Sequence, residues 1–576
     1  MTTFAVAFAE ALEELGVRHA FGVSGGAISF FWSALGGTGI EVTHFRHESG
    51  AAFAACEASI ASGRPVVVFV TTGPGLTNVL TGVYATRHEA ARVILVSAST
   101  ESGMHGRRPI QETGPRTLPW DGIFTAGPLF DFATVVGSPG ELDAVTGALA
   151  GGLAARPRFL AHVSLTLPAQ RGAVPGSAGV RPPARTAARP AAAAGASGAA
   201  PAAVTAGSGE AAVAAYELLH DQPWVLWVGA GTRHLAGPVR RLARAAGVPV
   251  MATSRGKGVI AEDDPAYLGV TGFAGHPSVL AYLDRHRPRY TLVMGTALGD
   301  TASGYHPGYA PSIAFVHVDL DPAVHGQAYP AVKTVPVVAD AGAFCTRLAE
   351  LFEAGQPAPV LTAPGVRPFG DAAPPGPGDR VHPDRLIDAV QAVFVDSGQL
   401  VMAETGNSLA WAINRLRFTD PTRWRGPSGL VGSMGHFSTG VVGAALATAR
   451  PAVALVGDGS MLMLNEVSTA VATGAPAIWV VLNDSCYNMC AQGAEVLGLT
   501  NVDCSLPETD FAAYARSLGA TGITVRHAGE LNGSLAAALQ AAGPVVVDVH
   551  IDPRACAPTA GRNAGLLRDG TAGGTR

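Results

Sequence analysis

The chain has 576 residues, which is too many for one hydrophobic core and predicts about three domains. Hydrophobic residues make up 48% of it and charged residues 14%, as in a folded protein with a large interior. A formal net charge of −5 is small for this length, so we expect no nucleic acid partner. The opening segment lacks the basic start of a signal peptide, and no run is long and apolar enough to span a bilayer. We therefore expect a cytoplasmic protein without a membrane partner.

Residues 1–169 alternate between helical and strand patterns, which is typical of a doubly wound α/β domain. A glycine loop with Gly25 and Gly26 follows the first strand, and the turn Thr72-Gly73-Pro74-Gly75 follows the third. The predicted strands are residues 19–23, 41–45, 65–71 and 92–97.

Glu48 is the main candidate for proton chemistry in this domain. It follows a strand and precedes a helix of small residues, predicted for 51–62, where a carboxylate is poorly solvated. Such a carboxylate could exchange a proton with a ring nitrogen of a ligand. The ordinary alternative is an acid that stabilises the N-terminus of a helix.

Two segments rich in Ala, Pro and Gly separate three predicted domains. Residues 170–208 and 353–380 are predicted linkers, and 556–576 a flexible tail. The middle domain, 209–352, is Rossmann-like, with strands at 225–228, 249–252, 291–294 and 314–318. Its turn Gly229-Ala230-Gly231-Thr232 raises the alternative of a dinucleotide site, but the full glycine spacing of that motif is missing.

The last domain, 381–555, contains a βαβ unit that predicts a metal and phosphate site. Strand 453–456 ends in Gly457-Asp458-Gly459-Ser460, a helix is predicted at 464–472, and strand 477–482 ends in Asn483-Asp484. Oxygen donors at the carboxyl ends of two parallel strands can share a Mg²⁺ ion. The glycine-rich turn at a helix N-terminus can bind the phosphate groups that complete the ion's shell.

These residues resemble the motifs of thiamine diphosphate (ThDP) enzymes. The GDG turn followed by the 483–484 pair resembles the family's diphosphate motif, and RHESGA followed by TTGPGLTN resembles its pyrimidine-binding domain. The resemblance is to the acetohydroxyacid synthase and pyruvate decarboxylase group. It implies an α/β fold of three doubly wound parallel-sheet domains: pyrimidine-binding, central and diphosphate-binding.

The resemblance assigns a metal site and a cofactor site. It implies that Asp458, Asp484 and the carbonyl of Cys486 hold Mg²⁺. Asp484 stands where the family usually has Asn and the spacer is one residue shorter, so Asn483 is the alternative ligand. Glu48 falls on the family's activating glutamate, Gly432 on the carbonyl that binds the aminopyrimidine, and Met434 on the side chain that bends the cofactor. The implied ThDP contacts are Glu48, Gly73, Glu404, Thr405, Gly406, Asn407, Gly432, Met434, Gly457, Asp458, Gly459, Ser460, Asp484 and Asn488.

The resemblance also bears on FAD and on assembly. The central motif that usually carries an FAD-contacting arginine is Gly295 to Asp300 here and has none, so we expect no FAD. Glu48 and the metal site lie on different domains, which meet across two subunits in this family. A homodimer or homotetramer with active sites at the subunit interfaces is therefore implied.

The predicted reaction is carboligation. Decarboxylase-like members have a histidine pair near positions 110–111 and a glutamate near Cys490, both absent here, while Gln111 aligns with a glutamine of carboligases. We expect a 2-keto acid such as pyruvate to be decarboxylated and its acyl unit added to a second carbonyl. The alternatives are a decarboxylase or lyase that releases an aldehyde, and a catalytically silent ThDP-binding homologue. The predicted catalytic residues are Glu48 and Gln111, and the predicted substrate pocket is Gly25, Gly26, Gln111, Met489 and Cys490.

Overall fold

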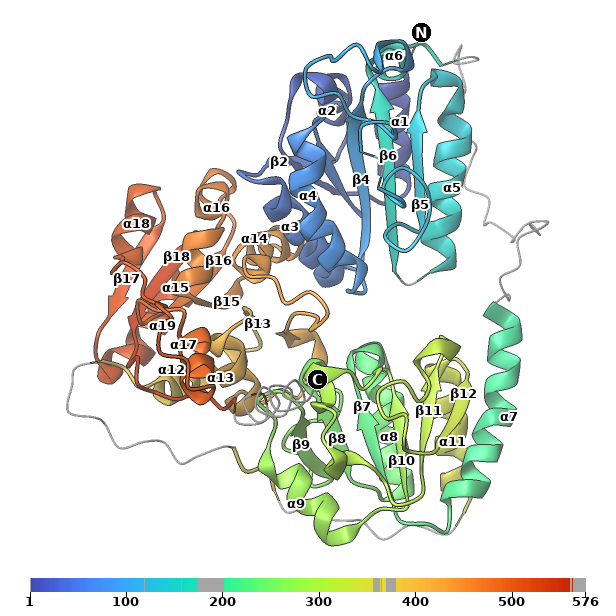
Figure 1. Cartoon of the computed structure of the whole chain (residues 1–576), viewed down its shortest axis with the longest axis vertical. Helices are drawn as coiled ribbons and strands as arrows, with labels where there is room; N and C mark the ends of the chain where they lie inside the picture. The colour runs from blue at the N-terminus through green and yellow to red at the C-terminus, as the bar shows by residue number, and fades with distance from the viewer. Residues whose placement is uncertain are drawn as a thin grey trace.

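The chain folds into three α/β domains, each built on a six-stranded parallel sheet (Figure 1). This computed structural model describes residues 2–118, 120–156, 158–174, 201–355, 363, 365–368, 380–559 and 562, with the side chains of 201–206 left out. The predicted fold class is confirmed. Most of the predicted linkers and tail lies outside the described residues.

The first sheet has the strand order β2-β1-β3-β4-β6-β5. Its central strands are apolar on both faces because helices cover both sides, and β3 is buried along its whole length. The strands are β1 (His19–Gly22), β2 (Glu41–His44), β3 (Val66–Val70), β4 (Arg92–Ser99), β5 (Phe132–Val136) and β6 (Phe159–Thr166). The helices are α1 (Phe4–Glu14), α2 (Ser29–Leu35), α3 (Glu48–Ser62), α4 (Pro74–Arg87), α5 (Leu142–Ala155) and α6 (Leu167–Arg171).

The middle sheet has the order β12-β11-β10-β7-β8-β9. Its strands are β7 (Trp224–Val228), β8 (Val250–Thr253), β9 (Tyr267–Thr271), β10 (Tyr290–Met294), β11 (Ala314–Asp319) and β12 (Thr334–Val338). Its helices are α7 (Pro201–Leu219), α8 (Ala236–Ala246), α9 (Pro277–His286), α10 (Asp300–Ser303) and α11 (Ala341–Ala354). Helix α7 begins inside the segment predicted as a linker, because its many alanines favour a helix.

Packing explains the glycines of the turn after β7. A Cβ atom on Gly229 would lie 2.5 Å from the carbonyl oxygen of Gly295, and one on Gly231 would lie 2.8 Å from the Gly295 Cα. The loops after β7 and β10 thus touch backbone to backbone. The glycine pattern therefore needs no bound dinucleotide to explain it.

The third sheet has the order β14-β13-β15-β16-β18-β17. Its strands are β13 (Leu400–Ala403), β14 (Trp424–Arg425), β15 (Ala452–Gly457), β16 (Ala477–Asn483), β17 (Thr521–Val525) and β18 (Val545–His550). Its helices are α12 (Pro383–Val390), α13 (Asn407–Arg415), α14 (His436–Thr448), α15 (Asp458–Met463), α16 (Val467–Thr473), α17 (Asn488–Val496), α18 (Phe511–Ser517) and α19 (Leu531–Gln540). None of the described helices, in any domain, is long and apolar enough to cross a membrane.

The helix predicted at 464–472 is wrong in its boundaries. Helix α15 begins at Asp458, directly after β15, and the backbone is extended at Leu464 before α16 begins at Val467. The interruption lets Glu466 reach the first domain, where its carboxylate accepts the backbone N–H groups of Arg46, at 3.0 Å, and His47, at 3.3 Å. A contact between domains has overridden the local helical pattern.

Helices α3 and α14 join the first and third domains side by side (Figure 1). Both consist mainly of small residues, which allows a close approach. A Cβ atom on Gly443 would lie 2.0 Å from the carbonyl oxygen of Ala54, and one on Gly440 would lie 2.7 Å from Cγ of Glu57. One cluster of buried apolar side chains runs through this contact into both sheets.

Adding one methyl group at this contact is expected to destabilise the protein. Gly443→Ala places a Cβ atom against the backbone of α3, which cannot move without separating the two helices. We therefore expect the free energy of unfolding to fall by about 1–3 kcal/mol. Gly147→Ala is the matched control, because Gly147 lies in α5 with open space around it. This substitution should raise the free energy of unfolding by about 0.5–1 kcal/mol. Thermal unfolding of the two variants measures both effects, and equal shifts would contradict the close packing.

Glu466 gives the stability of the protein a specific pH dependence. Burial raises the pKa of its carboxyl group from 4.5 to about 7. The folded chain therefore holds this proton more tightly than the unfolded chain, and the contribution to stability falls as the pH rises from about 4.5 to about 7. The penalty for ionisation above this window is on the order of 3 kcal/mol.

We therefore expect Glu466→Gln to stabilise the protein more at pH 8 than at pH 5. The amide stays neutral and keeps an oxygen for the N–H groups of Arg46 and His47. Urea unfolding at the two pH values measures the difference, with Glu10→Gln on the exposed face of α1 as the control. The same stability change at both pH values would show that Glu466 does not titrate in this range.

Candidate active site

The carboxyl ends of β1, β2 and β3 gather the candidate residues of the first domain. Glu48 opens α3 and is 8% exposed, and its Oε2 accepts a hydrogen bond of 3.1 Å from the Asn78 side-chain amide. Asn78 comes from α4 and was not predicted. It is the last residue of the TTGPGLTN segment, one helical turn after the Gly73 turn. Together the two side chains present a carboxylate with an amide that fixes its orientation.

Gln111 lies beside the turn after β3. Thr72 Oγ1 donates to Gln111 Oε1 over 3.2 Å, and a Cβ atom on Gly73 would lie 2.9 Å from Cβ of Gln111. Gly73 has a φ of 60° and Gln111 one of 53°, so the contact uses two left-handed residues. Gly25 lies on the same edge, where a Cβ atom would be 2.5 Å from Thr71 Oγ1, whereas Gly26 has open space around it.

Asp458 and Asp484 form the acidic centre of the third domain. Asp458 is in the first turn of α15, together with the buried Gly459 and Ser460, directly after Gly457 at the end of β15. Its Oδ1 accepts the N–H of Gly459 at 2.7 Å and its Oδ2 that of Cys486 at 3.3 Å. Burial raises the pKa of Asp458. Burial, together with repulsion from Asp458, raises the pKa of Asp484 to about 6. A buried and a half-buried carboxylate, with no ion pair to either among the described residues, are the donor set that a divalent cation would stabilise.

Asn483 points away from this centre. Its side-chain amide donates to Asp548 Oδ1 and to the carbonyl of Thr509, both at 2.9 Å, and it is 2% exposed. The Asp484 carboxylate instead accepts a hydrogen bond of 2.6 Å from the Asn488 side chain. The Cys486 carbonyl, on the same loop, accepts the Asn488 N–H at 2.8 Å and has a second lone pair.

The loop after β13 contains polar atoms that lack partners. The Thr405 Oγ1 and Asn407 Oδ1 atoms are buried, and neither has a hydrogen-bond partner within the described part of the chain. Gly432, with a φ of 55°, lies beside Thr405, and Met434 is half-buried nearby on the same loop. Gly406, between Thr405 and Asn407, has a φ of 129°.

Glu404 has a structural role that its sequence position did not predict. Its Oε2 accepts the N–H groups of Phe437 at 2.9 Å and Ser438 at 3.0 Å, so it holds the first turn of α14. Burial raises the pKa of this carboxyl group. The carboxylate is thus occupied by the protein itself, and the neighbouring Thr405 and Asn407 are the atoms left for a ligand.

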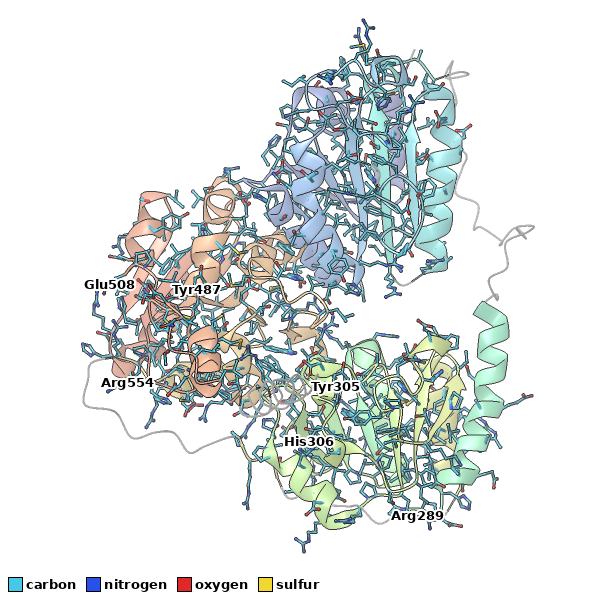
Figure 2. The ribbon with its side chains drawn as sticks, in the orientation of Figure 1. Arg289, Tyr305, His306, Tyr487, Glu508 and Arg554 are labelled. Atoms are coloured by element: carbon cyan, nitrogen blue, oxygen red, sulfur yellow. The ribbon has the colours of Figure 1, made fainter. Side chains whose placement is uncertain are left out.

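The two groups of candidate residues lie on different domains of the chain. No hydrogen bond or ion pair among the described residues joins Glu48, Asn78, Gly73 or Gln111 to the residues around Asp458. The predicted pocket is divided in the same way, since Met489 and the exposed Cys490 lie in α17 of the third domain. Figure 2 places Tyr487, from the loop after Asp484, among the side chains of the third domain and apart from the first.

Three family models match the chain, one on each domain. The N-terminal TPP binding domain of thiamine pyrophosphate enzymes matches residues 2–116, the central domain matches 212–348, and the C-terminal TPP binding domain matches 404–549. The chain belongs to the thiamine pyrophosphate enzymes. The predicted family is confirmed: this is a ThDP-dependent enzyme that forms or cleaves C–C bonds.

Several relatives of this thiamine pyrophosphate enzyme are named as acetolactate synthases. A putative acetolactate synthase large subunit of Mycobacterium tuberculosis is 29% identical over 539 residues, which are 91% of this chain and 93% of the relative. The large subunit of Escherichia coli acetolactate synthase isozyme 1 is 26% identical over 557 residues, 94% of this chain and 92% of the relative. A solved ThDP-dependent 4-hydroxybenzoylformate decarboxylase of Rhodococcus jostii has a TM-score of 0.77 at 18% identity, covering 96% of this chain and 99% of that one. This last similarity shows the shared fold.

The residues of the third domain fit the diphosphate end of ThDP. The paired Asp458 and Asp484 carboxylates suit the cation that accompanies a diphosphate, and the first turn of α15 offers N–H groups to phosphate oxygens. The unpartnered Thr405 and Asn407 atoms provide hydrogen bonds that the protein leaves unused. Burying these groups without a ligand costs free energy, which cofactor binding would recover.

Proposed function

We propose that the chain is an acetolactate synthase-like carboligase, which decarboxylates a 2-keto acid such as pyruvate and adds the acyl unit to a second carbonyl. The observation that carries the proposal is Gln111. It places an uncharged amide beside Gly73 and Thr72, at the edge of the sheet that holds Glu48. An amide can orient an acceptor carbonyl and has no proton to lose at neutral pH.

Three histidines that could act as proton donors contact other groups of the protein. His47 accepts the N–H of Ser49 at 3.1 Å as the N-cap of α3, and His436 Nε2 lies 2.9 Å from Glu57 Oε1. His105 lies 3.5 Å from Glu112 and against Gly114. The hydrogen bonds of His47 and His436 within the protein leave neither of them as a ready proton donor, which favours transfer of the acyl unit over its release as an aldehyde.

We assign roles to the two groups of residues. Bound ThDP would supply a nucleophilic carbon and an electron sink. Glu48 would hold and move a proton at the aminopyrimidine ring, with Asn78 fixing the carboxylate. Asp458, Asp484 and the Cys486 carbonyl would hold Mg²⁺. The Asn483 side chain would not, because the hydrogen bonds from its NH2 group hold it toward Asp548 and Thr509. Gly432 and Met434 would contact the rings of the cofactor.

The proposed enzyme is a homodimer or a larger homo-oligomer. Its active site would combine Glu48 of one subunit with Asp458 of another, because the two groups lie on different domains and no hydrogen bond or ion pair among the described residues joins them within one chain. Exposed apolar side chains support such an interface. Near the third-domain group they are Leu430, Leu462, Met463 and Tyr487, and Ile110 lies beside Gln111.

The test is a turnover assay with pyruvate, ThDP and Mg²⁺, with and without aldehyde and keto acid acceptors, followed by mass spectrometry of the products. We expect an acyloin product whose yield rises with the acceptor. Free acetaldehyde as the main product in the presence of every acceptor would contradict the proposal and indicate a decarboxylase. ThDP binding without consumption of any 2-keto acid would indicate a catalytically silent homologue.

A further inference from the structure

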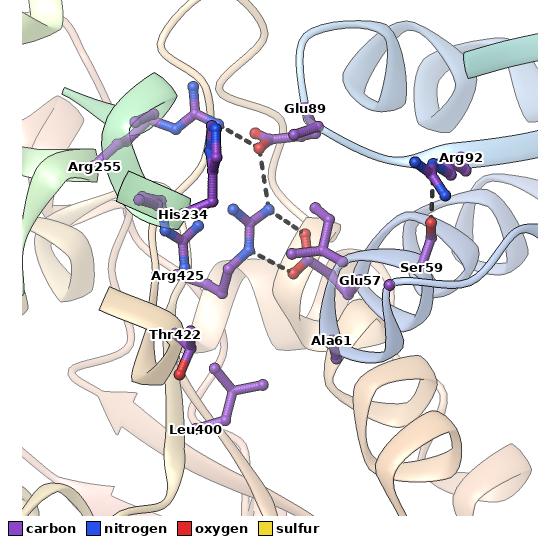
Figure 3. A pocket seen from close by; sticks show the side chains of 15 residues that line it. Glu57, Ser59, Ala61, Glu89, Arg92, His234, Arg255, Leu400, Thr422 and Arg425 are labelled. Atoms are coloured by element: carbon purple, nitrogen blue, oxygen red, sulfur yellow. Dashed lines mark hydrogen bonds and ion pairs between the residues drawn. The ribbon is translucent and has the colours of Figure 1, made fainter. Parts of the chain in front are cut away.

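A cavity of ≈ 380 Å³ lies where the three domains meet, away from the candidate active site (Figure 3). The first domain contributes the end of α3 and the loop after α4, the middle domain the loops after β7 and β8, and the third domain β13 and β14. Its volume is in the range of small-molecule sites. None of the residues assigned to ThDP or to Mg²⁺ lines it.

The described lining of the cavity carries more positive than negative charge. Arg255 and Arg425 stand against the two glutamates Glu57 and Glu89, and Arg233 adds one positive charge that no described carboxylate balances. His234 lines the same cavity from the loop after β7. An excess of buried charge of one sign is costly unless a ligand of opposite sign binds.

Both glutamates are already paired. Arg425 binds Glu57 through two hydrogen bonds of 2.8 and 2.7 Å and Glu89 through one of 3.1 Å. Arg255 also pairs with Glu89, whose other oxygen accepts the N–H of Ser428 at 3.0 Å. Figure 3 shows Arg425 and Arg255 reaching Glu89 from different domains. These carboxylates therefore have little capacity left for a further cation.

Arg233 is a cation that has no carboxylate partner among the described residues. Its hydrogen bonds go to the carbonyls of Pro421, at 2.6 and 3.2 Å, and Trp424, at 2.7 Å, and no described carboxylate forms an ion pair with it. Burial and the neighbouring Arg425 and Arg255 guanidiniums lower the pKa of Arg233 to about 9. The Nε of Arg255 is also buried and, among the described residues, has no hydrogen-bond partner. Two guanidinium groups of the middle domain thus retain unused capacity for an anion.

The opposite part of the lining is apolar. Ile60, Ala61, Ala90 and Leu400 provide a hydrophobic wall beside the arginines. A ligand that fills the cavity would therefore combine an anionic group with an apolar body. Guanidinium groups bind phosphate oxygens in a well-defined geometry, and a phosphate group has enough oxygens to accept hydrogen bonds from both Arg233 and Arg255.

We propose that this three-domain cavity binds a small organic phosphate, with the phosphate group on Arg233 and Arg255 and the apolar part against Ile60 and Leu400. Such a ligand would bridge all three domains and so stabilise their arrangement. It would also bind next to Glu89, which holds the start of the loop that leads to Gly432.

Isothermal titration calorimetry with phenyl phosphate tests the proposal. The protein is first saturated with ThDP and Mg²⁺ in a phosphate-free buffer, so that the diphosphate site is occupied. We expect one saturable site per chain, tighter binding of phenyl phosphate than of inorganic phosphate or benzoate, and a higher melting temperature in its presence. No saturable binding, or tighter binding of benzoate, would overturn the proposal.

Two variants locate the site. Arg233→Gln removes the unpaired cation, and Ala61→Glu adds a negative charge to the wall while keeping every existing hydrogen bond. We expect each to weaken phenyl phosphate binding at least tenfold. Arg241→Gln is the control, because Arg241 pairs with Glu353 away from the cavity. If the Arg233→Gln variant does not fold, the phenyl phosphate affinity of the Ala61→Glu variant tests the site instead. Unchanged affinity in a folded Arg233→Gln or Ala61→Glu variant would overturn the assignment.

Discussion

Replacing Glu48 by glutamine is expected to lower kcat by about 10²–10⁴-fold, because the amide cannot exchange the proton that a positioned general acid or base supplies. The amide has nearly the shape of the carboxylate and can still contact Asn78, so the fold and ThDP binding should persist. Steady-state turnover of pyruvate and a ThDP titration, followed by protein fluorescence, separate the two effects.

The control for this variant is Glu101→Gln. Glu101 is exposed in the same domain and its side chain makes no capping hydrogen bond. Its substitution should leave both kcat and ThDP affinity unchanged. A Glu48→Gln enzyme that retains activity within twofold of the wild type would remove Glu48 from the proton chemistry.

Replacing Asp458 by alanine is expected to weaken Mg²⁺-dependent ThDP binding by at least about 100-fold. The substitution removes one of the two carboxylate ligands. We therefore expect a larger loss of affinity than the 10–100-fold that is typical when a residue that only supports a metal ligand is lost. Asp484→Ala should act in the same direction. Calorimetric titration of ThDP at several Mg²⁺ concentrations measures the loss.

Asn483→Ala discriminates between the two possible ligands on this loop. It leaves Asp548 with an unpaired buried oxygen, so it should lower the melting temperature. It should change the Mg²⁺ dependence of ThDP binding far less than Asp484→Ala does. The reverse order, with Asn483 essential and Asp484 dispensable, would reassign the metal ligand.

Local sequence patterns predicted the framework of the fold well, because buried parallel strands are continuous apolar runs. Strands β3, β7, β10 and β15 are of this kind, and each lies within or close to its predicted range. Strand β6 was not predicted, since His162 and Ser164 interrupt its apolar run. Both are buried in the structure, where Ser97 Oγ lies 2.7 Å from His162 Nε2 and donates to Ser164 Oγ over 2.9 Å.

The candidate site was predictable where a motif places a residue at a strand end. Glu48, Asp458 and Asp484 all lie at such positions. Asn78, Glu466 and the Glu404 contacts with α14 were missed, because each depends on a partner distant in the sequence. The cavity at the three-domain junction is an extreme case, since its arginines come from separate loops and only the assembled domains bring them together.

Complementation between subunits tests the central claim most directly. Co-expression of Glu48→Gln and Asp458→Ala chains gives mixed dimers in which one site carries both changes and the other carries neither. If half of the dimers are mixed and each has one intact site, we predict about a quarter of the wild-type pyruvate turnover, although each variant alone is nearly inactive. Activity of the mixture no higher than that of the separate variants would contradict an active site built from Glu48 of one subunit and Asp458 of the other.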